Sequence, residues 1–146
     1  MTNASEQGTI VVGVDGSPSA ARALGWAISE AQLRGAALYI LHAFPAMKSL
    51  TGSTAHEYYP QIEKEAEDEL SSILSRAPDL GGLTHVTRAV RPGNPAELLI
   101  EESRGAELVV VGSRGLGGFT GLVLGSVSAQ VAHHAHCPVV VVRHDE

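Results

Sequence analysis

Five short apolar segments alternate with helix-like segments along the chain, and this alternation constrains the fold more than any other feature. The first segment, TIVVGV, lacks the apolar–polar alternation of a half-exposed strand, which favours burial on both faces. Regular strand–helix alternation is typical of a parallel sheet covered by helices on both faces. We therefore predict an open five-stranded α/β sheet, with strands at residues 9–14, 36–44, 83–90, 108–111 and 138–143.

Apolar residues at three- and four-residue spacing predict the helices between these strands. The first helix begins after Ser17, a candidate N-cap that a proline follows, and ends at Gly35. The second covers the apolar stripe at residues 62–74, and we predict the polar segment before it, residues 45–55, as a loop. The last runs from about residue 126 to 135.

The third helix has the strongest start signal in the chain. Asn94 is a candidate N-cap, Pro95 occupies the first helical position, and Glu97 lies at the third position, as in a capping box. The helix is expected to end near Gly105. The strand before it, residues 83–90, carries alternating polar residues, which predicts a position at the edge of the sheet.

Length and composition limit the class of protein. We expect one domain over residues 1–146, with residues 1–8 as a flexible tail. The 10 basic and 16 acidic residues give a net charge of −6, so a nucleic-acid-binding surface is not expected. The single cysteine, Cys137, excludes an internal disulfide and suits a reducing compartment. Without a secretory signal or a membrane-spanning apolar run, the predicted location is the cytoplasm.

Residues 108–131 combine an apolar strand, a glycine-rich loop and a helix start. Backbone N–H groups can approach a ligand closely where there is no Cβ, and a helix N-terminus adds partial positive charge. The loop of about 13 residues is also longer than the usual connection of roughly 4–6 residues. This stretch therefore predicts a site that holds phosphate groups.

The spacing of the glycines separates three kinds of phosphate loop. A Walker A loop needs a lysine after its second glycine, and no lysine follows Lys64. A dinucleotide fingerprint needs Gly-x-Gly-x-x-Gly, but Thr120 occupies the third glycine position after Gly115 and Gly117. The remaining pattern is Gly112-x2-Gly115-x9-Gly125-Ser126.

This pattern resembles the ATP-binding motif of the universal stress protein family, Gly-x2-Gly-x9-Gly-[Ser/Thr], and matches it at every fixed position. The resemblance extends over most of the chain. Residues 12–17, 93–95, 106–115 and 137–142 are similar to the family's first strand and turn, third-helix entry, fourth strand and loop, and final strand. The resemblance implies a Rossmann-like, adenine nucleotide alpha hydrolase-like fold, ATP binding, and a homodimer joined through the last strand, residues 138–143.

Carried onto this chain, the resemblance implies a site built from distant segments. Asp15 would contact the ribose and phosphates and could hold Mg²⁺ with ATP, while Ala43 and Val111 would lie beside the adenine. Because Asp15 and Gly112 each follow a strand of a parallel sheet, we also expect them to be neighbours. The predicted nucleotide-binding residues are Gly13, Val14, Asp15, Ala43, Val111, Gly112, Arg114, Gly115, Gly125, Ser126, Val127 and Ser128.

The leading functional hypothesis is an ATP-binding, nucleotide-responsive stress regulator without efficient catalysis, because no residue can be named as a positioned base. The alternatives are a slow Mg²⁺-dependent ATP hydrolase, a dimeric interaction module that needs no nucleotide, and a cyclic AMP or AMP binder. A metal site at residues 133–137, HHAHC, is less favoured than a helix end, because adjacent helical residues point about 100° apart.

Overall fold

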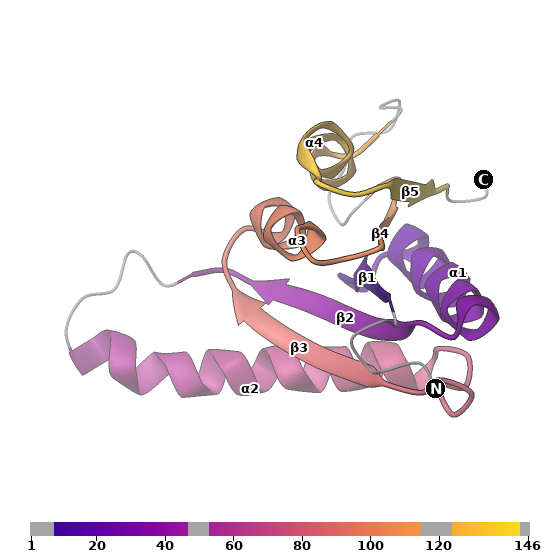
Figure 1. The fold of residues 1–146 in the computed structure, drawn as a ribbon. Coiled ribbons are helices and arrows are strands. Elements are labelled where there is room, and N and C mark those ends of the chain that lie inside the picture. Colours follow the sequence, from indigo (N-terminus) through magenta and orange to yellow (C-terminus); the bar gives the residue numbers. More distant parts are fainter. Residues whose placement is uncertain (1–7, 47–52, 115–123, 144–146) are drawn as a thin grey trace.

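The chain folds into a five-stranded parallel sheet with helices on both faces, which confirms the predicted fold class (Figure 1). The computed structural model describes residues 8–46, 53–114 and 124–143, and for residues 53–59 the backbone alone. In chain order the elements are β1 (Thr9–Gly13), α1 (Pro18–Arg34), β2 (Ala37–Phe44), α2 (Ser53–Ser75), β3 (Val86–Pro92), α3 (Pro95–Ser103), β4 (Leu108–Gly112), α4 (Ser126–His134) and β5 (Val139–Val142).

The strand order is β3-β2-β1-β4-β5, and each neighbouring pair runs parallel. Two of the three inner strands, β1 and β4, are buried almost throughout, in agreement with their continuous apolar sequences. β3 lies at one edge and is partly exposed, as its polar residues predicted. β5, half-buried along its length, forms the other edge.

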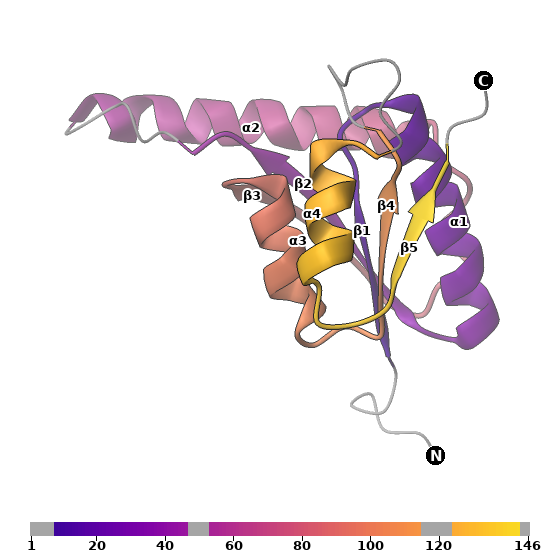
Figure 2. The same cartoon turned by 90° about the horizontal axis from the view of Figure 1, so that it is seen from above.

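Alternate residues of the strands face two separate cores. Val12 of β1 and Val110 of β4 pack with α1 and α2 on one face. Val11 and Val109, their chain neighbours, pack with α3 and α4 on the other. Figure 2 shows α3 and α4 side by side on the face turned toward the viewer. Both faces are thus covered, which explains why β1 and β4 carry almost no polar residues.

The connection from β3 to β4 carries the chain to the other side of β1. β1 pairs with β2, the next strand in the chain, on one side. On its other side β1 pairs with β4, a strand from much later in the chain. The loops that leave the carboxyl ends of β1 and β4 therefore diverge, and such a switch point is where ligands bind in open α/β sheets.

The largest boundary differences from the sequence prediction are at β3 and α2, and the other elements differ by at most two residues. The strand expected at residues 83–90 lies at Val86–Pro92, and its pairing with β2 continues to Phe44 opposite Pro92. α2 begins at Ser53, inside the segment predicted as a loop. Figure 1 shows the first turns of α2 extending past the sheet, so no core-facing apolar stripe marks them in the sequence.

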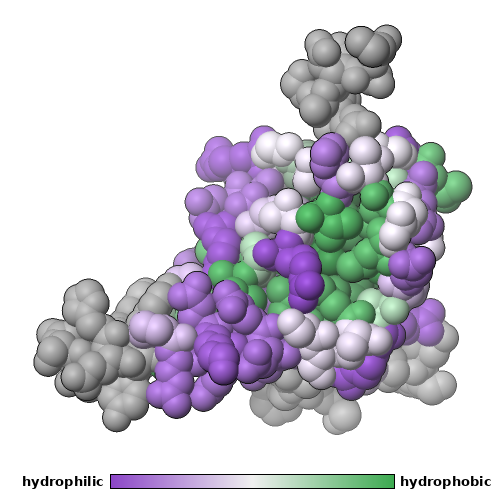
Figure 3. Space-filling model, turned by 90° about the horizontal axis from the view of Figure 1, so that it is seen from below, coloured by the Kyte–Doolittle hydropathy of each residue, from purple (hydrophilic) through white to green (hydrophobic). Residues whose placement is uncertain are grey.

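The outward side of α2 is solvated. Glu65, Glu67 and Asp68 are exposed, while Ala66 and Leu70 face the core. Figure 3 shows hydrophilic side chains over α2 at the lower left, beside a hydrophobic area on the same side of the molecule. No helix within the described ranges is long and apolar enough to cross a membrane.

The helix caps read from the sequence are present. The backbone N–H of Ala20 donates to Ser17 Oγ at 3.2 Å, and Gly35 ends α1 in the left-handed region with φ of 64°. Asn94 Oδ1 accepts the backbone N–H of Glu97 at 3.1 Å. These signals succeed because each cap involves residues only a few positions apart.

We expect Asn94→Ala to lower the free energy of unfolding by about 1 kcal/mol, because the N–H of Glu97 loses its side-chain acceptor. Asn94→Ser is the matched control, since a serine hydroxyl can accept the same bond. Urea denaturation monitored by circular dichroism measures the difference. Equal stability of the two variants would show that this cap contributes nothing.

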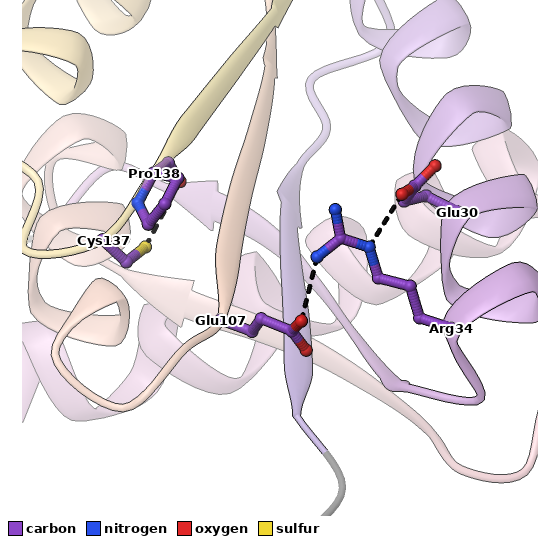
Figure 4. A network of polar contacts seen from close by, with 5 residues as sticks. All are labelled: Glu30, Arg34, Glu107, Cys137 and Pro138. Atoms are coloured by element: carbon purple, nitrogen blue, oxygen red, sulfur yellow. Dashed lines mark hydrogen bonds and ion pairs between the residues drawn. The ribbon is translucent and has the colours of Figure 1, made fainter.

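An ion-pair network ties α1 to the sheet at the end away from the switch point (Figure 4). The Arg34 guanidinium donates to Glu30 Oε1 at 2.7 Å and to Glu107 Oε1 at 2.9 Å. The hydrogen bond to Glu30, with that to Glu107, raises the pKa of Arg34. Because Arg34 and Glu107 are exposed and Glu30 is only half-buried, water screens the pairs, and we assign them a role in geometry rather than in stability.

Candidate functional site

A cleft opens at the carboxyl edge of the sheet, between the ends of β1 and β4. Its empty space is about 500 Å³, including the part open to solvent. The lining residues come from both arms of the switch point and from three helices. They are Gly13, Val14, Asp15, Ala20, Leu41, Ala43, Pro95, Leu99, Val111, Gly112, Arg114, Val127 and Ser128.

Most of the residues predicted for a nucleotide site line this cleft, and Asp15 and Gly112 do so together as expected. Gly125 and Ser126 do not line it but lie at the start of α4, next to lining residues. Gly115 lies outside the described residues. The sequence reasoning missed four lining residues: Ala20, Leu41, Pro95 and Leu99.

One wall of the cleft is apolar and includes two of the missed residues, Leu41 and Leu99. Leu41 lies two positions before Ala43 on β2, so strand alternation places both on one face and could have identified it. A Cβ added to Gly13 would lie 2.9 Å from Leu99 Cδ1 of α3, so Gly13 leaves room for that side chain. No local sequence pattern predicts that Leu99 lines the cleft, because its position depends on how α3 packs against β1.

Asp15 occupies the turn after β1, half-buried in the cleft wall. Its Oδ1 accepts the backbone N–H of Ser17 at 2.9 Å, and Gly16 between them has φ of 83°. This geometry is an Asx turn that leads into the N-cap of α1. The turn therefore holds a carboxylate at the mouth of the cleft, where hard cations such as Mg²⁺ find the oxygen ligands that they prefer.

Gly112, at the end of β4, touches the backbone of α1. A Cβ there would lie 2.6 Å from the carbonyl carbon of Ser19 and 2.7 Å from the nitrogen of Ala20. Both atoms belong to the main chain, so they cannot move away by a change of side-chain rotamer. The glycine is thus required by packing alone, and the same close approach brings the start of the glycine-rich loop to the N-terminus of α1.

Buried serine hydroxyls hold the two ends of the glycine-rich loop. Ser19 Oγ lies 3.2 Å from Ser113 Oγ and accepts the N–H of Arg114 at 3.2 Å. Ser128 Oγ donates to the carbonyl oxygen of Ser113 at 3.0 Å, and the N–H of Gly125 donates to the same oxygen at 2.6 Å. These bonds set residues 113 and 125 side by side, so α4 begins close to the end of β4.

The N-terminus of α4 supplies the positive end of a helix dipole to the cleft. Gly125 is its N-cap and makes no side-chain cap bond, while Val127 and Ser128 of the first turn line the cleft. First-turn N–H groups have no acceptor within their own helix and stabilise anions. Arg114, half-buried in the same wall, adds a full positive charge. Together these groups can bind a phosphate chain.

The histidine-rich segment before β5 has the features of an exposed helix end. His133, His134 and His136 are exposed, and the first two rings make an edge-to-face contact with centroids 4.7 Å apart. Burial raises the pKa of the neighbouring Cys137 thiol, which disfavours the thiolate that binds metals. Within residues 8–46, 53–114 and 124–143, no group of three histidine, cysteine or acidic side chains could hold a metal ion.

The family model and the curated relatives give one description. The model of the family described as "Universal stress protein family" matches residues 7–143. A universal stress protein of Mycolicibacterium smegmatis is 40% identical over 136 residues, which cover 92% of this chain and 45% of that protein. The chain thus spans about half the length of the curated relatives that it matches.

Solved structures share the fold. A universal stress protein in complex with cAMP is 30% identical and superposes with a TM-score of 0.61, covering 95% of this chain and 98% of that chain. A universal stress protein family protein from Arabidopsis thaliana with AMP bound is 21% identical, with a TM-score of 0.64 over 94% of this chain and 92% of that chain. At the latter identity the likeness concerns the fold alone.

Proposed function

The chain belongs to the universal stress protein family, and we propose that it binds ATP and acts as a nucleotide-responsive regulator without efficient catalysis. One observation carries the proposal. A single cleft joins apolar side chains, the N-terminus of α4, a cation and a carboxylate. These are the elements that a base, a phosphate chain and a phosphate-bound Mg²⁺ each require.

Each part of the nucleotide has a chemically suited partner. The adenine would lie against the apolar wall that contains Ala43 and Val111. The phosphates would accept hydrogen bonds from the first turn of α4 and pair with Arg114. Asp15 would hold Mg²⁺, which in turn supplies charge neutralisation to the phosphate oxygens.

Binding rather than turnover is proposed because of the ionisable groups that line the cleft. Among the described lining residues these are Asp15 and Arg114. Hydrolysis of ATP needs, in addition to charge neutralisation, a group that positions the attacking water. If Asp15 binds Mg²⁺, it is not available for that task. Slow Mg²⁺-dependent hydrolysis is the alternative.

A second candidate ligand is a cyclic or shortened adenine nucleotide. The solved relative that is 30% identical is described in complex with cAMP, and the Arabidopsis protein with AMP. Adenosine with at least one phosphate is the part that these ligands share with ATP. We therefore propose that adenosine monophosphate is the minimal ligand, and that additional phosphates extend toward α4.

We further propose that two copies of the chain pair through the last strand. β5 is an edge strand of four valines that are all half-buried in the single chain. An apolar edge strand with unpaired backbone N–H and C=O groups can pair with a strand of another chain. A dimer without a nucleotide role is the rival function. The cytoplasm stays the proposed location, supported by the single cysteine, and nucleic acid is not proposed as a partner.

Titration of the purified protein with ATP, AMP and cyclic AMP by calorimetry, with and without Mg²⁺, tests the function. We expect at least one adenine nucleotide to bind with Kd below about 1 mM, and Mg²⁺ to strengthen ATP binding more than cyclic AMP binding. GTP is the control for binding that depends on phosphates alone. If no nucleotide binds below about 1 mM, the nucleotide hypothesis is wrong and the interaction module is favoured.

A further inference from the structure

The backbone of Arg114 is held from both sides by hydroxyl groups at the start of α1. Ser17 Oγ donates to the carbonyl oxygen of Arg114 at 3.3 Å, and the N–H of Arg114 donates to Ser19 Oγ at 3.2 Å. Both serines are buried, each with 2% of its surface exposed. Arg114 lines the cleft, whereas neither serine is among the described residues that do. We call Ser17 and Ser19 the serine clamp, because together they bind both backbone polar groups of one cleft residue.

Each hydroxyl of the clamp can bind Arg114 and keep its other contacts. Ser17 Oγ donates its one hydrogen to the Arg114 carbonyl and still accepts the N–H of Ala20 as the cap of α1. Ser19 Oγ accepts the N–H of Arg114 and keeps its own hydrogen for another acceptor, such as Ser113 Oγ at 3.2 Å. Donors and acceptors therefore match, and the clamp forms at any pH at which the protein is folded.

The clamp also connects the two ionisable residues of the cleft. Among the described lining residues these are Asp15 and Arg114. The backbone N–H of Ser17 donates to Asp15 Oδ1 at 2.9 Å, while the hydroxyl of the same serine donates to the backbone of Arg114. One buried residue thus joins the turn that carries the carboxylate to the segment that carries the cation, although the two come from distant parts of the chain.

The elements that carry the clamp and its target are packed tightly against each other. Gly112, two residues before Arg114, approaches the backbone of Ser19 and Ala20 too closely to leave room for a Cβ. The hydroxyl of Ser113, between them, contacts Ser19 Oγ. Because α1 and the end of β4 are fixed in this way, the clamp holds the Arg114 backbone in one place. A cation whose backbone is fixed before a ligand arrives loses less conformational entropy on binding.

We propose that Ser17 and Ser19 are positioning residues that hold Arg114 for contact with the phosphates of a bound nucleotide. The inference rests on the proposed nucleotide-binding function. The serines do not contact the ligand themselves but act through the backbone of Arg114, whose guanidinium pairs with phosphate oxygens. The bond from Ser17 to Asp15 also sets the cation segment relative to the carboxylate turn, so that a phosphate chain and its Mg²⁺ are held together.

Ser19→Ala tests the clamp more cleanly than a change at Ser17, which also caps α1. It removes the acceptor of the Arg114 N–H, and we expect ATP affinity to fall about three- to ten-fold, the range for one partly exposed arginine–phosphate contact. Ser103→Ala is the matched control. Ser103 is 1% exposed, its Oγ accepts the N–H of His136 at 2.9 Å, and it lies at the end of α3 outside the cleft lining. We expect that variant to bind ATP as the wild type does.

A double-mutant cycle with Arg114→Met, measured by calorimetry with ATP and Mg²⁺, decides whether Ser19 acts through the arginine. Methionine keeps an unbranched side chain but cannot pair with phosphate. In the Arg114→Met background we expect Ser19→Ala to change ATP affinity by less than about two-fold, because no guanidinium remains to be positioned. Equal losses in both backgrounds, or an equal loss in Ser103→Ala, would overturn the inference. Wild-type affinity in Ser19→Ala would do the same.

Hydrogen exchange of the Arg114 amide, measured by NMR, gives a second readout that does not depend on a nucleotide. We expect this amide to exchange about five-fold faster in Ser19→Ala than in the wild type, as for the loss of one hydrogen bond, and at the wild-type rate in Ser103→Ala. Equal exchange in all three proteins refutes the clamp even where ATP binds. A wild type that binds no nucleotide, by contrast, refutes the proposed function and the inference with it.

Discussion

Replacing Gly112 by alanine is expected to lower the free energy of unfolding by roughly 1–3 kcal/mol and to weaken nucleotide binding. The added Cβ would lie 2.6 Å from the carbonyl carbon of Ser19 and 2.7 Å from the nitrogen of Ala20. Because both are main-chain atoms, β4 and α1 must move apart, and overpacking of this kind costs roughly 1–3 kcal/mol. Gly112 of β4 and Ala20 of α1 both line the cleft, so its shape must change as well.

Gly105→Ala is the control for this variant. A Cβ at Gly105 meets nothing within 4 Å, and its backbone is outside the left-handed region. Both substitutions restrict the unfolded chain to the same degree, so their difference isolates the clash. Urea denaturation gives the stabilities, and ATP titration gives the affinities. A Gly112→Ala protein as stable as Gly105→Ala would contradict the packing that we describe.

Asp15→Ala is expected to weaken ATP binding in the presence of Mg²⁺ by at least about ten-fold, or about 1.4 kcal/mol. The substitution removes the carboxylate that lines the cleft and could hold the cation. It also removes the acceptor of the Ser17 N–H, bonded at 2.9 Å, so a loss of stability of about 1 kcal/mol is expected in addition.

Asp15→Asn separates these two effects. The asparagine Oδ1 can accept the same N–H and keep the turn, but its side chain lacks the negative charge that attracts Mg²⁺. We expect near wild-type stability, an affinity loss similar to that of Asp15→Ala with Mg²⁺, and a much smaller loss without it. If Asp15→Asn binds Mg²⁺–ATP as the wild type does, Asp15 has no role in holding the cation.

Short-range patterns predicted much of the fold. The caps at Ser17 and Asn94 and the left-handed stop at Gly35 follow from bonds between near neighbours, and the structure confirms them. The edge position of β3 followed from its polar residues. The early turns of α2 were missed because they extend past the sheet, and no core selects an apolar stripe there.

The candidate site was predicted where it lies at strand ends. A parallel sheet brings the carboxyl ends of its strands to one edge, so Asp15 and Gly112 could be paired from topology alone. Leu99 and Pro95 could not be found in this way, because α3 reaches the cleft only by packing across β1. The serine contacts at the base of the loop likewise join residues such as Ser19 and Ser113, far apart in the chain.

The sequence by itself determined the order of strands and helices, their caps, and the glycine spacing that pointed to phosphate binding. These properties depend on propensity, periodicity and bonds across a few residues. Only the tertiary structure decided that Gly112 must be glycine to meet α1, and that the hydroxyl groups of Ser19 and Ser113 lie side by side. The physical reason is that close packing and buried hydrogen bonds depend on which distant segments of the chain come into contact. A local sequence pattern does not predict these contacts.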